Sequence, residues 1–141
     1  MKTFYNDYKF LIVPIVMWLG IQLFKVIYDF NKTKKWNFRR IWGAGGMPSS
    51  HSAVVVSLAT LMGKYEGVNS SLFAISAVLA LVVMYDAAGV RRAVGKQAHI
   101  LNDILMNQET TGVEKLQEMT GHTPFQVLAG AILGFIAGVI C

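Results

Sequence analysis

The sequence predicts an all-α integral membrane protein, a bundle of about four transmembrane helices with interfacial helical segments. Hydrophobic residues make up 54% of the 141 residues and charged residues only 15%, with a mean hydropathy of +0.46, which is more apolar than a soluble domain of this length. The apolar residues also form four separate stretches. No repeat, low-complexity tract or shift in composition divides the chain, so we expect a single membrane-embedded domain over residues 1–141.

The first apolar stretch covers residues 10–28 and is interrupted only by Gln22 and Lys25. Its length approaches the ~20 residues that a helix needs to cross the hydrocarbon core of a bilayer. A charged start before an apolar run is also typical of a secretory signal peptide, but no small-residue cleavage site follows here. We therefore expect an uncleaved first transmembrane helix.

Three further apolar stretches complete the predicted bundle. Residues 53–62 are apolar for too short a run, so this helix crosses only if its polar amino end is buried in protein or faces a water-filled cavity. Residues 72–85, extendable to residue 90, form the third span, and residues 125–141 form the fourth. Residues 91–123 are polar and mixed in charge, and we expect one or two interfacial helices there.

The last apolar stretch carries Gly130, Gly134 and Gly138 at positions i, i+4 and i+8. This spacing places the three glycines on one helical face, where a second backbone can approach closely. The face can pack against another helix of the same chain or against a second copy, and the sequence leaves both interpretations open. Because four helices give one chain little protein with which to surround a polar site, we expect a homodimer joined at these glycines.

A glycine-rich loop precedes the second apolar stretch and leads through Gly46 to Pro48, Ser49, Ser50 and His51. A proline and a serine N-cap are typical of a helix start, where free backbone N–H groups and the helix dipole favour an anion. Ordinary capped helices begin in the same way. His51 favours a phosphate site, because an ionisable residue one turn into a membrane helix is expensive unless it is functional.

A second histidine, His122, stands just before the fourth apolar stretch, in Gly121-His122-Thr123-Pro124. Two imidazoles at one phosphate can divide the work, with one attacking phosphorus and the other protonating the leaving oxygen. Each histidine alone is more often a capping or packing residue. The pair, each beside the start of a membrane helix, favours catalysis.

Basic residues outnumber acidic ones by thirteen to eight, which gives a formal charge of +5. Cations are needed to hold a phosphate dianion and to stabilise its transition state. In a four-helix topology the first and third loops lie on one side, so their cations and both histidines can meet at one membrane face. The alternative is the positive-inside rule, by which basic loops only set orientation. Long apolar runs separate the basic residues, which argues against nucleic-acid binding. The candidates for phosphate binding are Lys25, Lys32, Arg39, Arg40, Arg91, Arg92 and Lys96.

Three ordered motifs resemble those of a known family. They are residues 46–52 (Gly-Met-Pro-Ser-Ser-His-Ser), 86–92 (Asp-Ala-Ala-Gly-Val-Arg-Arg) and 121–130 (Gly-His-Thr-Pro-Phe-Gln-Val-Leu-Ala-Gly). Through these motifs nearly the whole chain resembles the divergent branch of the type 2 phosphatidic acid phosphatase superfamily, which is similar in its site to bacterial acid phosphatases and vanadium haloperoxidases. The resemblance implies a hydrolase that acts on lipid phosphates through a phosphohistidine intermediate, without a metal or other cofactor.

The resemblance also implies roles for matching residues. His122 is the expected nucleophile and His51 the expected acid, while Gly46, Ser49 and Ser50 are expected to bind the phosphate. The lysine and arginine of the family's first motif are matched in part. One interpretation pairs Lys32 with Arg39, and the competing one pairs Lys25 with Arg40.

The chain departs from the family pattern at two positions. Gln126 stands where the family has a carboxylate that orients the nucleophilic histidine. A glutamine can accept a hydrogen bond from imidazole but cannot stabilise its charged form, so a carboxylate from Asp86, Glu114 or Glu118 is expected to substitute. Leu116 stands where the family has an arginine, and that role is expected to pass to one of the two neighbouring arginines, Arg91 or Arg92.

These observations predict a membrane phosphatase that hydrolyses a phosphate monoester or diphosphate on a lipid. The main alternative is a protein with a decayed catalytic site that binds phosphate headgroups or acts as a membrane scaffold. A metal site made of His51, His122 and Asp86 is chemically allowable, but the surrounding lysines and arginines would repel a cation.

We expect the protein in the bacterial cytoplasmic membrane, in contact with membrane lipids. The first and third loops hold nine basic residues against three in the amino terminus and second loop, which favours a cytoplasmic site. Six of those nine are also candidates for phosphate binding, and sites in the wider superfamily often face outward. The preference for the cytoplasmic face is therefore slight.

Overall fold

The computed structural model describes residues 2–36, 46–107, 115–116, 118 and 121–141. Over these residues the protein is built from helices and contains no strand. The helices are α1 (Lys2–Thr33), α2 (Ser50–Tyr65), α3 (Ser71–Ala88), α4 (Val90–Asn107) and α5 (Pro124–Ile140). The all-α prediction is therefore confirmed for the part of the chain that is described.

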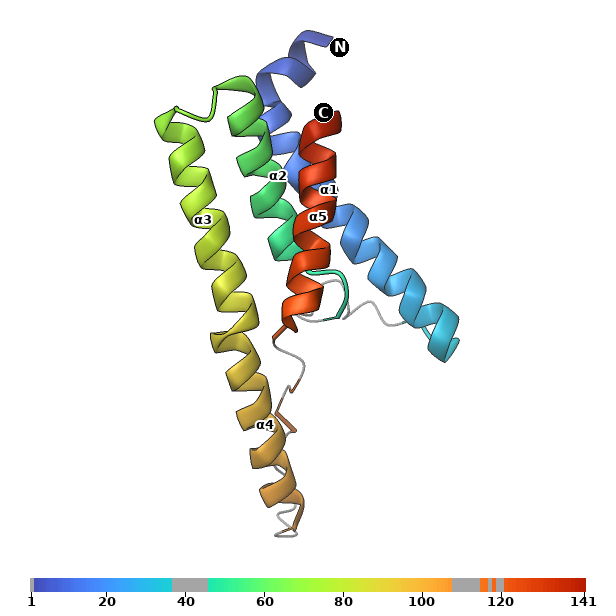
Figure 1. Cartoon of the computed structure of the whole chain (residues 1–141). Coiled ribbons are helices and arrows are strands. Elements are labelled where there is room, and N and C mark those ends of the chain that lie inside the picture. Colours follow the sequence, from blue (N-terminus) through green and yellow to red (C-terminus); the bar gives the residue numbers. More distant parts are fainter. Residues whose placement is uncertain (1, 37–45, 108–114, 117, 119–120) are drawn as a thin grey trace.

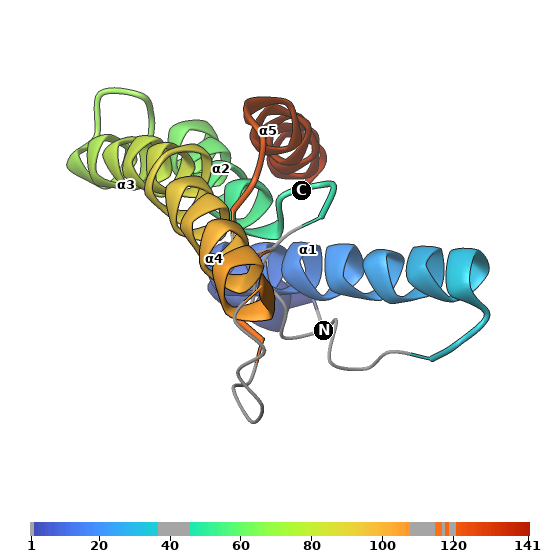
Figure 2. The same ribbon diagram turned by 90° about the horizontal axis from the view of Figure 1, so that it is seen from below.

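Helix α2 is the centre of the bundle and packs against α1, α3 and α5 (Figures 1 and 2). Its small residues make this possible, because Ser52, Ala53, Ser57 and Ala59 are all buried and let three neighbours approach. Against α3, the apolar core is formed by residues of both helices: Val55, Ala59 and Ala80, with Val56 and Val83 packed beside them.

The three glycines of α5 face α2 of the same chain and are buried. A Cβ added to Gly134 would overlap the carbonyl oxygen of Ala53, and one added to Gly130 would overlap the carbonyl oxygen of Ser49. Backbone therefore packs directly on backbone along this seam. The assignment of this face to a homodimer interface is corrected by the packing, because α2 covers it within one chain. A homodimer stays a prediction that needs another surface.

Two helical runs, Phe4–Thr33 and Ser71–Met106, are long and apolar enough to cross a membrane. The other two predicted spans form α2, with 16 residues, and α5, with 17 residues, which fall short of the ~20 residues of a full crossing. Large apolar side chains nevertheless cover the outside of α3 and α5, among them Leu81, Phe125 and Phe135. These exposed side chains fit an apolar surrounding.

Helix α4 continues almost along the axis of α3 and extends beyond the rest of the bundle (Figure 1). Gly89 separates the two helices, donating its N–H to the Tyr85 carbonyl oxygen (2.8 Å) and accepting from the Ala93 N–H (2.9 Å). The expected helix after the third span therefore exists, but it prolongs that span. The C-terminal half of α1 runs away from the other helices (Figure 2).

Candidate active site

The amino end of α2 is a capped helix start. Ser49 is fully buried, and its side-chain oxygen accepts hydrogen bonds from the Ser52 N–H (3.3 Å) and the Ser52 hydroxyl (2.9 Å). Gly46 has a φ of +80°, a left-handed conformation that favours glycine. The loop thus turns sharply into α2 and places His51 in its first turn. The Ser49 N–H also donates to the Gln126 carbonyl oxygen (3.1 Å), which joins the starts of α2 and α5.

The amino end of α5 carries a capping box. The Gln126 N–H donates to Oγ1 of Thr123 (3.3 Å), and the Thr123 N–H donates to Oε1 of Gln126 (3.0 Å). His122 directly precedes this cap, and its backbone N–H donates to the Ala87 carbonyl oxygen at the end of α3 (3.1 Å). His122 is therefore held where α3 and α5 meet.

The structure brings the two predicted histidines together. The ring centroids of His51 and His122 lie 6.4 Å apart at an interplanar angle of 74°, and His122 is only 2% exposed. Both ring nitrogens of His122 and Nδ1 of His51 are buried without a hydrogen-bond partner among the described residues. Because nearly all buried polar groups in proteins are hydrogen-bonded, three such nitrogens at one place make this the candidate site.

Positive charge surrounds these rings. Burial, followed by the charges of Lys25, His51 and Arg91, lowers the pKa of His122 to about 4. At neutral pH the His122 imidazole is therefore neutral, which is the nucleophilic form. Lys25 lies on α1, is 4% exposed and contributes positive charge at His122.

Of the two candidate lysines in α1, Lys25 is the one whose charge acts on His122. Lys32 is exposed near the end of α1 that runs away from the bundle (Figure 1). Arg39 and Arg40 lie outside the described residues, so neither proposed lysine–arginine pair is tested.

The three basic residues at the start of α4, Arg91, Arg92 and Lys96, do not all lie near the histidines. Arg91 Nε lies 2.6 Å from Oδ2 of Asp86, and its charge reaches the histidines. Arg92 and Lys96 instead line an open groove of about 530 Å³ along α4. The structure therefore brings the charge of Arg91 to the histidine pair, whereas Arg92 and Lys96 line the groove along α4.

No carboxylate among the described residues orients His122. Asp86 is engaged by Arg91, and Glu118 by Asn102 and His99. Glu114 lies outside the described residues. The Gln126 side chain is used in the α5 cap, so its oxygen accepts from Thr123. The described residues also contain no group of three or more His, Cys, Asp or Glu side chains suited to a metal ion.

Sequence reasoning missed two contributors to this arrangement. The capping box could have been found, because Thr123 and Gln126 have the Thr-x-x-Gln spacing of such caps. Asn102 gave no signal, because it binds backbone groups fourteen positions away at Leu116. That contact is tertiary, so no local pattern in the sequence predicts it.

The chain is similar to a known protein family and to one curated membrane protein. The model of a family described as "Divergent PAP2 family" matches residues 6–137. The chain is also 35% identical over 133 residues to the "Uncharacterized membrane protein YuiD" of Bacillus subtilis (strain 168), with 84% of each chain covered. No solved structure is significantly similar to it. The matched residues include α2, α3 and the histidines at both helix starts.

Proposed function

The chain belongs to the Divergent PAP2 family, and from this premise we propose that it is a metal-independent membrane phosphatase that hydrolyses a phosphate monoester or diphosphate on a lipid. The observation that carries the proposal is the pairing of His51 with His122, in which both ring nitrogens of His122 and Nδ1 of His51 are buried without a hydrogen-bond partner among the described residues. A phosphoryl group between the rings would supply the missing acceptors and the atom to be attacked.

The reaction has two steps. In the first, a ring nitrogen of neutral His122 attacks phosphorus, the bond from phosphorus to the lipid oxygen breaks, and protonated His51 gives that oxygen its proton. In the second, His51 takes a proton from water, the water oxygen attacks phosphorus, and the phosphorus–nitrogen bond breaks. Inorganic phosphate leaves, and both histidines return to their starting states.

The charges near the histidines suit the phosphoryl group. Lys25 and Arg91 supply positive charge from α1 and α4, and Asp86 holds the Arg91 guanidinium in place. At the start of α2, beside Ser49 and Ser50, free N–H groups and the helix dipole favour the phosphate oxygens. These groups stabilise the charge that develops on oxygen in the transition state.

A lipid substrate is supported by an apolar groove formed by the two segments that flank His122. The groove has a volume of about 640 Å³ and lies between the end of α3 and the start of α5. Pro124, two residues after His122, forms part of its wall, and Ala88 follows the residue whose carbonyl binds His122. We assign this groove to the hydrocarbon chain next to the phosphate. It is lined by Leu81, Val82, Met84, Tyr85, Ala88, Pro124, Val127 and Leu128.

In the proposed arrangement α2 and α5 also cross the membrane, which gives four spans. Their 16 and 17 residues amount to about 24–26 Å of helix, against a hydrocarbon core of about 30 Å. The helix starts that carry the histidines would then lie slightly inside the hydrocarbon edge, within reach of a lipid phosphate. We place this end at the cytoplasmic face. Cys141, at the opposite end of α5, should then react with a membrane-impermeant maleimide in intact cells, whereas labelling only after lysis, with Cys141 shown to be accessible, would reverse the orientation.

The test of the activity uses purified protein and a panel of lipid phosphates in EDTA. Phosphatidic acid, phosphatidylglycerophosphate and a polyprenyl diphosphate are offered, and release of inorganic phosphate is measured. Acid quenching of the wild type should trap a phosphohistidine that His122→Ala lacks. Absence of phosphate release from every lipid would refute the proposal, and labelling that persists in His122→Ala would refute the role of His122.

A phosphate-binding protein without turnover is the second candidate. The observation that favours it is the engagement of Gln126 in the helix cap, which leaves His122 without the side chain that orients the nucleophile elsewhere in the superfamily. Such a protein would bind inorganic phosphate or vanadate with a dependence on Lys25, yet release no phosphate from any lipid.

A further inference from the structure

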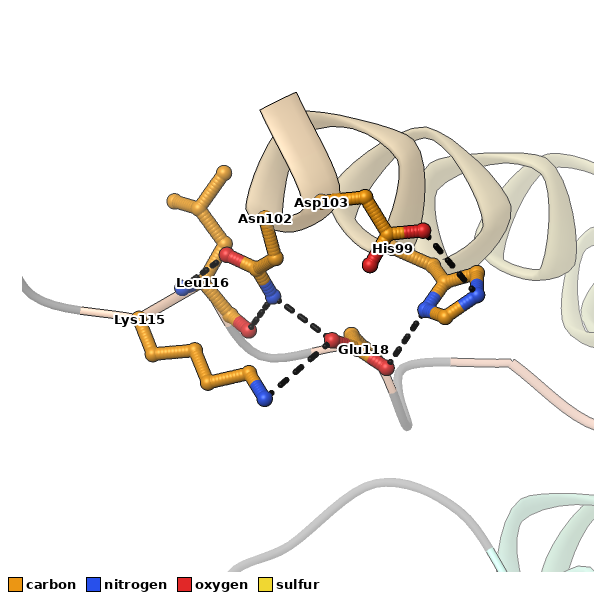
Figure 3. A network of polar contacts seen from close by, with 6 residues as sticks. All are labelled: His99, Asn102, Asp103, Lys115, Leu116 and Glu118. Carbon is orange, nitrogen blue, oxygen red and sulfur yellow. Dashed lines mark hydrogen bonds and ion pairs between the residues drawn. The ribbon is translucent and has the colours of Figure 1, made fainter. Parts of the chain in front are cut away.

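A network of hydrogen bonds joins α4 to residues that follow it in the chain (Figure 3). Asn102 is 2% exposed, accepts from the Leu116 N–H (2.8 Å) and donates to the Leu116 carbonyl oxygen (2.9 Å). Its amide nitrogen also donates to Oε1 of Glu118 (2.7 Å). One side chain therefore satisfies both backbone groups of Leu116 and holds a carboxylate beside them.

Glu118 has further partners in the same network. Its Oε2 lies 3.1 Å from Nδ1 of His99, and its Oε1 lies 3.9 Å from Nζ of Lys115 (Figure 3). The hydrogen bond from Asn102, together with His99 and Lys115, lowers the pKa of the Glu118 carboxyl. The carboxylate is therefore ionised at neutral pH, and the network is intact there.

Closer to the histidine pair, the chain is held to α4 and α3 by its backbone. Gly121 packs so tightly that a Cβ would overlap the backbone of Arg92. His122 then donates its N–H to the Ala87 carbonyl oxygen (3.1 Å). Together with the bonds at Asn102, these contacts fix Leu116 and Glu118 on α4, Gly121 against Arg92, and His122 at the end of α3.

We infer that Asn102 is a positioning residue for His122, acting by fixing Leu116 and Glu118 on α4. The inference rests on the proposed function, because it assigns Asn102 a part in the reaction of His122. No side chain among the described residues hydrogen-bonds the His122 ring, and Gln126 is used in the α5 cap. The ring is therefore placed by the backbone anchors on either side of it.

This role predicts how much kcat falls when Asn102 is replaced. A misplacement of about 1 Å of a reacting group can lower a rate about 100-fold. Asn102→Ala removes three hydrogen bonds but leaves the histidines, Lys25 and Arg91 unchanged. We expect kcat to fall about 10- to 100-fold while KM stays within about twofold, because the phosphate-binding groups are untouched.

The decisive measurement does not need turnover. Full-length protein in detergent is treated with diethyl pyrocarbonate, and the modification rates of His122 and His51 are followed by mass spectrometry of their peptides. His122 is buried in the wild type, so it should react slowly. In Asn102→Ala its rate should rise about tenfold, the scale of one to two lost hydrogen bonds, while the rate at His51 stays unchanged.

Asp103→Asn is the matched control. Asp103 neighbours Asn102 on α4, is exposed, and contacts His99 one turn away. Its replacement should leave kcat and the His122 modification rate at their wild-type values. An equal rise in both variants would show a general loosening of α4 and overturn the inference, as would an unchanged His122 rate in Asn102→Ala.

A second variant covers the case in which Asn102→Ala fails to fold. Glu118→Ala keeps the two bonds to Leu116 and removes the hydrogen bond from Asn102 together with the contacts to His99 and Lys115. Because the bonds to Leu116 remain, we expect a smaller rise at His122, about threefold. If no lipid phosphate is hydrolysed by the wild type, the proposed function fails, whereas the modification rates still decide whether Asn102 holds His122.

Discussion

His122 is held from two sides, and the two regions that hold it are built differently. On the α5 side, the helix is fixed to α2 by backbone-on-backbone packing at Gly130 and Gly134. On the α4 side, the chain before His122 is fixed by side-chain hydrogen bonds that centre on Asn102. The first region depends on glycines that let backbone approach closely, whereas the second depends on a few side-chain hydrogen bonds that single substitutions can remove.

This difference separates stability from placement. The seam of α2 and α5 buries backbone and small side chains, so any added atom forces the two helices apart. The α4 network can lose hydrogen bonds while the bundle stays packed, because α4 lies beyond the other helices (Figure 1). Substitutions in the seam should therefore abolish folding, and substitutions near α4 should change the reactivity of a folded protein.

The largest effect is expected from breaking the seam with Gly134→Leu. The new side chain overlaps the Ala53 carbonyl oxygen, and because the neighbour is backbone, overpacking here should exceed the usual cost of about 1–3 kcal/mol. We expect loss of monodisperse protein in detergent size exclusion. Gly20→Leu is the control, since nothing lies within 4 Å of its added Cβ. A folded Gly134→Leu protein with a smaller oligomeric mass would restore the glycine face as a homodimer interface.

A large effect on activity, without loss of the fold, is expected from Lys25→Met. The buried ammonium of Lys25 is replaced by an apolar side chain of similar length, so the phosphoryl group loses a charged partner. Charged hydrogen bonds contribute about 1.5–3 kcal/mol, and kcat/KM for a lipid phosphate should fall about 10- to 100-fold. Lys32→Met, at the exposed end of α1, should stay within about twofold. An equal loss of kcat/KM in both variants would show that Lys32 also acts on the substrate.

The rate of His122 phosphorylation should depend on pH in a way that reports the positive charge around its ring. Since its pKa is lowered to about 4, the neutral form persists well below the ordinary value of about 6.5. Phosphohistidine formation from an aryl phosphate, whose leaving group needs little protonation, should therefore stay constant from pH 7 to 5 and fall near pH 4. Lys25→Met removes a positive charge, raises the pKa of His122, and should move this fall to higher pH. A wild-type midpoint near 6.5 would show that His122 is not buried among cations.

Local patterns in the sequence were enough to predict the apolar helices and the position of the two histidines at helix starts. The apolar stretches became helices, and the serine and threonine caps place His51 and His122 at helix starts because each cap depends on neighbours within three residues. Residues that act across the fold could not be placed in this way. Lys25 and Lys32 both lie on α1, and only the crossing of α1 with α2 puts Lys25 at the site. The same holds for Asn102, whose partner Leu116 is reached through tertiary contact.

The smallest effect is expected from Gln126→Glu, which tests whether the missing carboxylate limits the reaction. From the sequence, a carboxylate here should raise the rate by stabilising the His122 imidazolium. In the structure, Oε1 of Gln126 accepts from the Thr123 N–H, and a glutamate can keep that bond while adding negative charge at the start of α5. This favours the cap by about 0.3–1 kcal/mol, so we expect a slightly higher unfolding temperature and a rate within about threefold of wild type. Gln126→Ala, which removes the cap, is the comparison and should lower the unfolding temperature. A rate increase of tenfold or more in Gln126→Glu would mean that the carboxylate leaves the cap for His122, and that the backbone anchors alone do not orient the ring.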